Sequence, residues 1–250
     1  MLALKSCVFS VLASVGILMA AIPRPLWAAA VNAVETFQGV ARNERGEIVY
    51  IEEHRLRYQN GQIKQNDTRY LDAEGKEFAA LTSKFTTHPY VPTYDFQDKR
   101  FGREDGTRVE DDVVRVYGRK DQAASKTDGS IKLTDNMITG QGLHFFLRDH
   151  LEEFSREGVV KTVKFLIPLE GDYYTFRIRP INKPEAAPGT LSLLIEIDNV
   201  LLRLFAPRLE VQYDVATKRL LSYEGASNLL TGDESVQNVM ITYRYDQGNT

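Results

Sequence analysis

A carboxylate and an imidazole lie two residues apart in the segment 48–58, IVYIEEHRLRY. Alternate side chains of an extended strand share a face, so Glu52 and His54 lie on the same face as Tyr50. Burial of an unpaired charge is unfavourable, so an inward-facing pair would need a partner or a wet cavity. Tyr50, Glu52 and His54 are therefore predicted ligand-binding residues. For the Glu52 and His54 pair we favour the other interpretation, a β-bulge or a strand end that turns this half outward, and keep the pair as the named candidate for a ligand site.

The four histidines do not show the spacing of a metal site. His144 and His150 are six residues apart, which places them on different sides of a helix, and no His-Glu-x-x-His run exists. We predict no metal and no cofactor. His150 lies on the apolar stripe of its helix, where it is either a core histidine with one hydrogen-bonded nitrogen or a fourth ligand-binding residue.

Motifs of nucleophilic or phosphate chemistry are absent. The chain has no Gly-x-Ser-x-Gly elbow and no glycine-rich phosphate loop after a strand. Acidic residues cluster at 110–112 and 152–153, but adjacent acidic side chains point apart and are usually solvated. A hydrolase that uses carboxylates distant in the sequence remains an alternative to a non-enzymatic protein.

The elements that position these side chains are short β-patterned runs separated by turn residues. This alternation is typical of an antiparallel meander. Asn60-Gly61 is the strongest turn signal, because a type I′ hairpin needs positive φ at both central positions. Asp105-Gly106 and Asp128-Gly129 also predict turns. Strand 62–71 is polar on both faces, which indicates an edge strand or the wall of a solvated cleft. The predicted strands span 34–41, 47–58, 62–71, 76–86, 94–101, 112–118, 130–134, 159–167, 174–179, 190–199, 208–214, 219–224 and 239–245.

One amphipathic helix is predicted over 142–157, with Gly158 as its C-terminal cap. Its apolar stripe is wide and needs an apolar surface to cover. The stripe comprises Leu143, Phe146, Leu147, His150, Leu151 and Phe154. Arg148 and Glu152 lie on the opposite, wet face, where their spacing allows an ion pair. The predicted fold is mainly β: a curved antiparallel sheet or open barrel covered by this helix.

The N-terminal residues 1–30 have the features of a secretory signal peptide. Lys5 precedes an apolar run over 7–22, which is shorter than the about 20 residues of a membrane span. Cleavage is predicted after Ala30, with Ala28 and Ala33 as alternative positions, and leaves 31–250 as a single domain. Cys7 opens the apolar run, so we expect no lipidation. The mature chain then has no cysteine, which favours the bacterial periplasm.

The charge of the mature chain argues against a nucleic-acid partner. Without Lys5 and Arg24, 31 − 2 = 29 basic residues stand against 34 acidic ones, a net charge of −5. No strong basic field is available to hold nucleic acid. No Lys/Arg-rich amphipathic helix is present to hold an anionic membrane; peripheral membrane contact stays an open alternative.

Three features of the C-terminal half carry a resemblance to known proteins: the helix ending at Glu157-Gly158, the strand 159–165, and the run YDVATKRLLSYEGASNLL at 213–230. Within that run, Tyr223-Glu224-Gly225 predicts a turn that closes a strand. Together these features resemble a group of exported bacterial proteins of unknown function, similar in architecture to periplasmic lipoprotein carriers. The resemblance implies an open, curved antiparallel sheet that holds acyl chains under a helical lid, and it assigns no site residue.

The sequence therefore predicts a non-enzymatic periplasmic protein that binds a small hydrophobic or amphipathic molecule, such as a lipid, or handles an envelope component. Barrel mouths are frequent ligand sites, but this step is an analogy from fold. The alternatives are the hydrolase and a structural or interaction module that uses exposed strand edges.

Overall fold

The computed structural model describes residues 32–156, 158–199, 203, 208–231 and 235–246. The predicted signal peptide, 1–30, lies outside the described residues. The elements are β1 (Asn32–Arg42), β2 (Ile48–Gln59), β3 (Gln62–Leu71), β4 (Glu77–Lys84), β5 (Thr93–Asp98), β6 (Arg103–Glu110), β7 (Val113–Arg119), β8 (Thr127–Lys132), β9 (Met137–Ile138), α1 (Gly142–Asp149), α2 (Leu151–Phe154), β10 (Lys161–Ile167), β11 (Asp172–Ile181), β12 (Thr190–Ile197), β13 (Leu209–Asp214), β14 (Arg219–Leu230) and β15 (Val236–Tyr245).

All fifteen strands belong to one sheet. Its order is β8-β7-β6-β5-β4-β3-β2-β1-β15-β14-β13-β12-β11-β10-β9, so the first and last strands of the chain are neighbours at its centre. Every pairing is antiparallel except β9 with β10. The predicted mainly β, antiparallel class is confirmed, and the sheet is not closed by hydrogen bonds.

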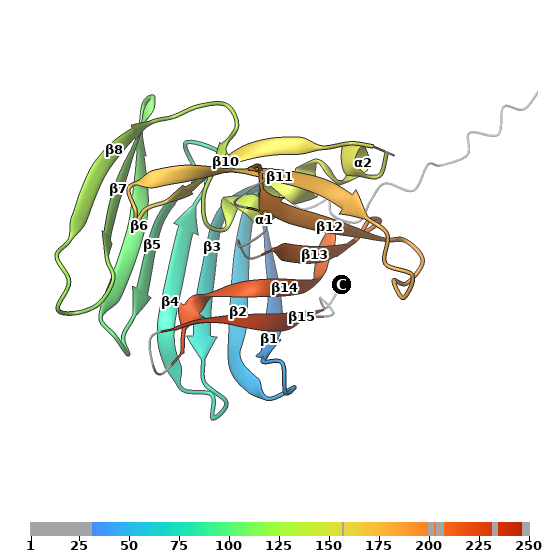
Figure 1. Cartoon of the computed structure of the whole chain (residues 1–250), viewed down its shortest axis with the longest axis horizontal. Helices are drawn as coiled ribbons and strands as arrows, with labels where there is room; N and C mark the ends of the chain where they lie inside the picture. The colour runs from blue at the N-terminus through green and yellow to red at the C-terminus, as the bar shows by residue number, and fades with distance from the viewer. Residues whose placement is uncertain (1–31, 157, 200–202, 204–207, 232–234, 247–250) are drawn as a thin grey trace, which may run out of the picture.

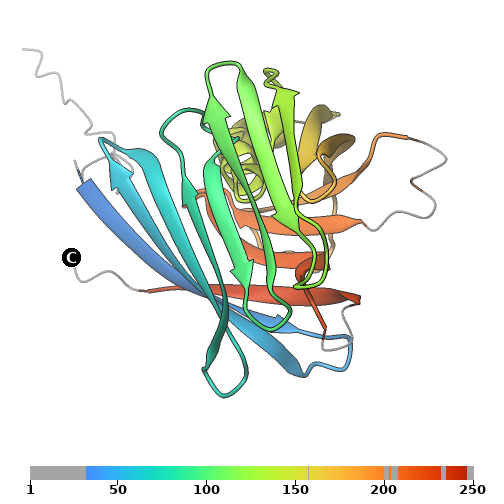
Figure 2. The same ribbon diagram turned by 90° about the vertical axis from the view of Figure 1, so that its left-hand side faces the viewer.

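The sheet folds over on itself. Strands β1 to β8 form one half, β10 to β15 cross them as the other, and the two helices fill one end between the halves (Figures 1 and 2). The two ends of the sheet meet through side chains, because Val114 and Val116 of β7 share a buried cluster with Met137 of β9 and Leu166 of β10. This arrangement encloses an interior that both halves line.

The helix is shorter than predicted and interrupted. α1 ends at Asp149, His150 leaves the helical conformation with φ −106° and ψ 9°, and α2 is a single turn. The imidazole Nδ1 of His150 lies 2.8 Å from the Phe146 carbonyl oxygen; a side chain that bonds the carbonyl four residues back competes with the regular backbone ladder. Leu147, Leu151 and Phe154 are buried against β10 to β13, as predicted.

Three predicted turns are continuous strand instead. Asp105-Gly106 lies inside β6, where Asp105 is buried on the inner face and Gly106 leaves room for the Tyr117 ring. Asp128-Gly129 lies inside β8, and β14 continues through Gly225 to Leu230. Sequence patterns for turns fail where a glycine makes room for a neighbour across the sheet.

Of two predictions for the region of β2 and β3, the turn at Asn60-Gly61 is confirmed, and the placement of 62–71 at an edge of the sheet is wrong. Asn60 and Gly61 have φ values of 52° and 74°, as a type I′ hairpin requires. β3, however, is a central strand between β2 and β4. Its polar residues Asn66 and Thr68 are buried on the inner face, so they line the interior and do not protect an edge.

Candidate functional site

Glu52 and His54 both face the interior, and the outward-turning bulge proposed for them is wrong. The register shift of β2 against β3 lies further along, between Arg57 and Tyr58. Glu52 is 6% exposed, and its Oε2 lies 3.0 Å from Nε2 of His54. The described residues include four buried carboxylates, and Glu52 is the one among them that pairs with neither arginine nor lysine.

Tyr243 reaches Glu52 from the far end of the sequence. Gly39 of β1 pairs with Glu52 on one side and with Tyr243 of β15 on the other. A Cβ at Gly39 would lie 2.7 Å from the Tyr243 ring, so the missing side chain lets this ring lie across β1. The Tyr243 hydroxyl then donates a hydrogen bond to Glu52 Oε2 at 3.2 Å.

A chain of hydrogen bonds connects this carboxylate to the helix. The Gln141 amide donates to Thr68 Oγ1 at 2.7 Å, and Thr68 Oγ1 lies 2.9 Å from His54 Nδ1. A carboxylate only accepts hydrogen bonds, so Nε2 of the His54 ring carries a proton and donates it to Glu52. Gln141, Thr68, His54, Glu52 and Tyr243 are hereafter the Glu52 cluster.

Tyr50 belongs to the shell around the Glu52 cluster. Its hydroxyl lies 3.0 Å from Ser227 Oγ, and its ring packs edge-on against Tyr70. Burial, and then the negative charge of Glu52, raises the pKa of Tyr50 well above its usual value, and the same two causes act on Tyr243. Both phenols therefore keep their protons and stay available as hydrogen-bond donors.

Three buried polar atoms, one in the Glu52 cluster and two beside it, have no hydrogen-bond partner within the described part of the chain. They are Asn66 Oδ1, Ser83 Oγ and Gln141 Oε1, all buried. Asn66 and Ser83 face each other across β3 and β4. Buried polar atoms are nearly always hydrogen-bonded in proteins, so this part of the interior has room for a further polar contact.

His150 does not join the other three predicted ligand-binding residues. It is half-buried at the end of α1, packs against the Phe146 ring and lies 4.0 Å from a carboxylate oxygen of Glu153. Its contacts match the core histidine with one hydrogen-bonded nitrogen. The structure thus brings Tyr50, Glu52 and His54 together and leaves His150 elsewhere on the helix.

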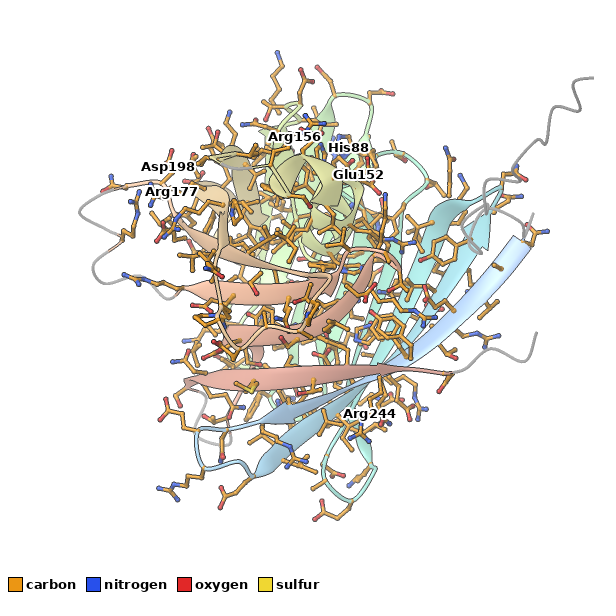
Figure 3. All side chains as sticks on the ribbon, turned by 90° about the vertical axis from the view of Figure 1, so that its right-hand side faces the viewer. His88, Glu152, Arg156, Arg177, Asp198 and Arg244 are labelled. Carbon is orange, nitrogen blue, oxygen red and sulfur yellow. The ribbon has the colours of Figure 1, made fainter. Side chains whose placement is uncertain are left out.

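A hollow of about 420 Å³ opens at the end of the molecule that the helix fills. Four segments that are distant in the sequence contribute to it: the β2–β3 turn, the β4–β5 loop, the end of α1 and the β13–β14 turn. We call it the mouth pocket. Its lining residues are Tyr58, Gly61, Gln62, Ile63, Lys64, Phe85, Thr86, Thr87, His88, Pro89, Phe145, Arg148, Asp149, Thr217 and Lys218. Figure 3 shows His88 and Glu152 at this end, beside the helices, and Arg244 on the far side.

The floor of the mouth pocket is aromatic. Phe85 and Phe145 are buried and meet edge to face with ring centroids 4.7 Å apart. They share a cluster with Leu56 and Phe37, and Phe37 stacks on His54 at 4.3 Å. The same aromatic layer therefore forms the floor of the mouth pocket and covers the Glu52 cluster.

Arg148 is the main polar group at this floor. Its Nη1 donates to the Tyr58 hydroxyl at 2.6 Å, and its guanidinium lies over the Tyr58 ring. The predicted ion pair with Glu152 does not form, because the break at His150 separates the two residues. Within the described residues, no carboxylate lies within 4.0 Å of the Arg148 guanidinium. Burial raises the pKa of Tyr58 to about 12, although the charge of Arg148 acts against this rise.

Arg148, which was predicted on the wet face, is half-buried, and Phe145, which the predicted apolar stripe does not include, is buried. Phe145 is 4% exposed because it packs on Phe85, so α1 contacts the sheet on two sides. The spacing of Phe145 and Arg148, three residues apart on one helix face, is the signal that could have indicated a second buried face.

A larger hollow, of about 520 Å³, lies between the β1–β2 turn and strands β13 to β15. Its charged walls, among them Arg42, Glu44 and Glu224, carry both signs, and Lys183 pairs with Glu210 and Glu224 at its side. It does not contact the helix, and no aromatic side chain is among its lining residues. We therefore take the smaller mouth pocket as the candidate site.

Neither a metal-binding cluster nor a membrane-spanning helix is found among the described residues. No group of three or more His, Cys, Asp or Glu side chains there is arranged to hold a metal ion. No helix in those ranges is long and apolar enough to cross a membrane.

Comparison with known protein families found no match, and comparison with curated proteins found no similar sequence.

Proposed function

We propose that this protein is a non-enzymatic binding protein for a small hydrophobic or amphipathic molecule, and that it works in the periplasm after export. The observation that carries the proposal is the mouth pocket, whose aromatic floor lies between a helix and a curved sheet. Its volume of about 420 Å³ is within the range of small-molecule sites, about 300–1,000 Å³. The N-terminal apolar run supports the proposed export.

The Glu52 cluster does not favour the hydrolase alternative. Thr68, His54 and Glu52 have the order of hydroxyl, imidazole and carboxylate in a hydrolytic triad. Thr68, however, is 1% exposed and already hydrogen-bonded to Gln141. A substrate would have to displace the aromatic layer to reach it, so we interpret the cluster as stabilising the fold.

Titration with the neutral fluorescent probe N-phenylnaphthylamine tests the proposed binding site. Thr86 is exposed on the pocket wall, and Thr86→Trp should fill the hollow and weaken probe binding about ten-fold or more. Thr242→Trp, at an exposed position of β15 away from the pocket, is the matched control and should bind like the wild type. Equal probe affinity in all three proteins, or no binding to any, would exclude the mouth pocket as the site.

Native mass spectrometry of the protein purified from its own cells provides an independent test. A small apolar or amphipathic molecule should co-purify with the wild type and be reduced in Thr86→Trp. Repeated absence of any bound molecule from the wild type would count against the proposal.

A further inference from the structure

Arg148 has hydrogen-bonding capacity that its surroundings do not use. A guanidinium carries five N–H donors, and the described residues provide one acceptor, the Tyr58 hydroxyl. That hydroxyl also donates to Glu35 Oε2 at 3.3 Å. Glu35 in turn pairs with Arg219, so its charge is already compensated.

The lining of the mouth pocket is positive overall. It contains Lys64, Arg148 and Lys218 against a single acid, Asp149. The Asp149 carboxylate accepts a hydrogen bond from Tyr90 at 3.1 Å. Lys218 pairs with the exposed Glu152 at 3.7 Å. An anion in the pocket would therefore meet more basic than acidic groups, although the chain as a whole is acidic.

His88 adds a neutral donor to the same wall. Its Nδ1 accepts backbone N–H groups of Tyr90 and Val91 at 3.1 and 3.0 Å. Because Nδ1 is an acceptor, the proton lies on Nε2, and no acceptor in the described ranges is hydrogen-bonded to that nitrogen. Burial lowers the pKa of His88, which keeps this tautomer at neutral pH.

We propose that the mouth pocket binds an amphipathic anion, with its apolar tail on Phe85 and Phe145 and its carboxylate or phosphate headgroup at Arg148. This inference rests on the proposed function, since it assigns a ligand class to the same pocket. Arginine suits the role because its planar donors match the oxygens of both headgroups.

Three octyl compounds with different headgroups test the inference on the full chain by displacement of N-phenylnaphthylamine. Octanoate and octyl phosphate should bind the wild type about ten-fold tighter than octanol, the range of charge-assisted hydrogen bonds. Arg148→Gln should lower the affinity for both anions to that for octanol and leave octanol unchanged. Arg148→Lys should retain part of the preference, because it keeps the charge but not the planar fork.

Arg115→Gln is the matched control, since Arg115 is exposed on β7 and pairs with Glu110; it should change none of the three affinities. The tighter of the two anions identifies the headgroup. Equal affinity of the wild type for octanol and both anions would overturn the anion inference while leaving pocket binding intact. Failure of all three compounds and of the probe to bind would overturn the proposed function itself.

Discussion

The Glu52 cluster and the mouth pocket lie on opposite sides of one aromatic layer. They differ in how many hydrogen-bond partners their charged group has. Below the layer, the Glu52 carboxylate accepts from His54 and Tyr243. Above it, the Arg148 guanidinium has one phenolic partner and borders a hollow. We interpret a buried charge that is held by two side-chain donors inside a sheet as stabilising the fold. A charge with unused donors beside a hollow that has an aromatic floor supports the proposed ligand site.

The largest expected effect comes from removing the helix contact on which both regions depend. Phe154 is fully buried against β10 to β13, and Phe154→Ala should lower the free energy of unfolding by about 3–5 kcal/mol. Urea unfolding should show this loss, and probe binding should weaken as well. Glu152→Ala, at an exposed position of the same turn, should change stability by less than about 0.5 kcal/mol. Similar losses in the two variants would mean that the helix does not support the fold in this way.

Removal of the Glu52 carboxylate should lower the stability of the fold without changing ligand binding at the mouth pocket. Glu52→Leu leaves the His54 N–H and the Tyr243 hydroxyl without an acceptor, so we expect a loss of about 2–4 kcal/mol in urea unfolding. Affinity for the neutral probe should stay at the wild-type level. Glu53→Leu, which removes an outward carboxylate paired with Arg69, should cost about 1 kcal/mol or less. A Glu52→Leu protein that folds normally but no longer binds the probe would place the binding site in the interior.

The pH dependence of stability should report on His144, which lies between the two regions. Burial, together with the charges of Arg148 and His54, lowers its pKa to about 3 from 6.5. The unfolded chain therefore takes up this proton first as the pH falls. The stabilisation is fully present above pH 6.5 and is lost progressively toward pH 3, with a loss of about 2 kcal/mol at pH 5.

The measurement is urea unfolding of wild type and His144→Gln at pH 7 and pH 5. The variant has no imidazole to titrate, so its loss between the two pH values should be smaller by about 2 kcal/mol. Comparing the two proteins cancels the contribution of the carboxylates they share. The same loss in both would show that His144 accepts a proton freely in the folded protein.

The smallest expected effect is that of Arg148 on stability. In Arg148→Gln the Tyr58 hydroxyl keeps its hydrogen bond to Glu35, and no carboxylate loses an ion-pair partner. The free energy of unfolding should therefore fall by about 1 kcal/mol or less. Thermal unfolding at pH 7 would measure this change. A loss as large as that of Glu52→Leu would contradict the contrast between the two regions and make Arg148 part of the core.

Several features followed from the sequence because they depend on local backbone geometry. The two-residue period of a strand places Tyr50, Glu52 and His54 on one face wherever that strand lies. The Asn60-Gly61 pair sets its own hairpin, because few residues tolerate positive φ. The apolar stripe of the helix likewise required a cover for Leu147 and Leu151, and the sheet provides it.

Long-range pairing decided the rest. Nothing in the segment 48–58 indicates that Tyr243 donates a hydrogen bond to Glu52, because their contact requires β1 to pair with both β2 and β15 and Gly39 to lie between them. The mouth pocket depends likewise on four separate segments meeting at one end. Residue patterns report which face of its own element a side chain occupies, whereas partners from distant strands are fixed only when the whole sheet has folded.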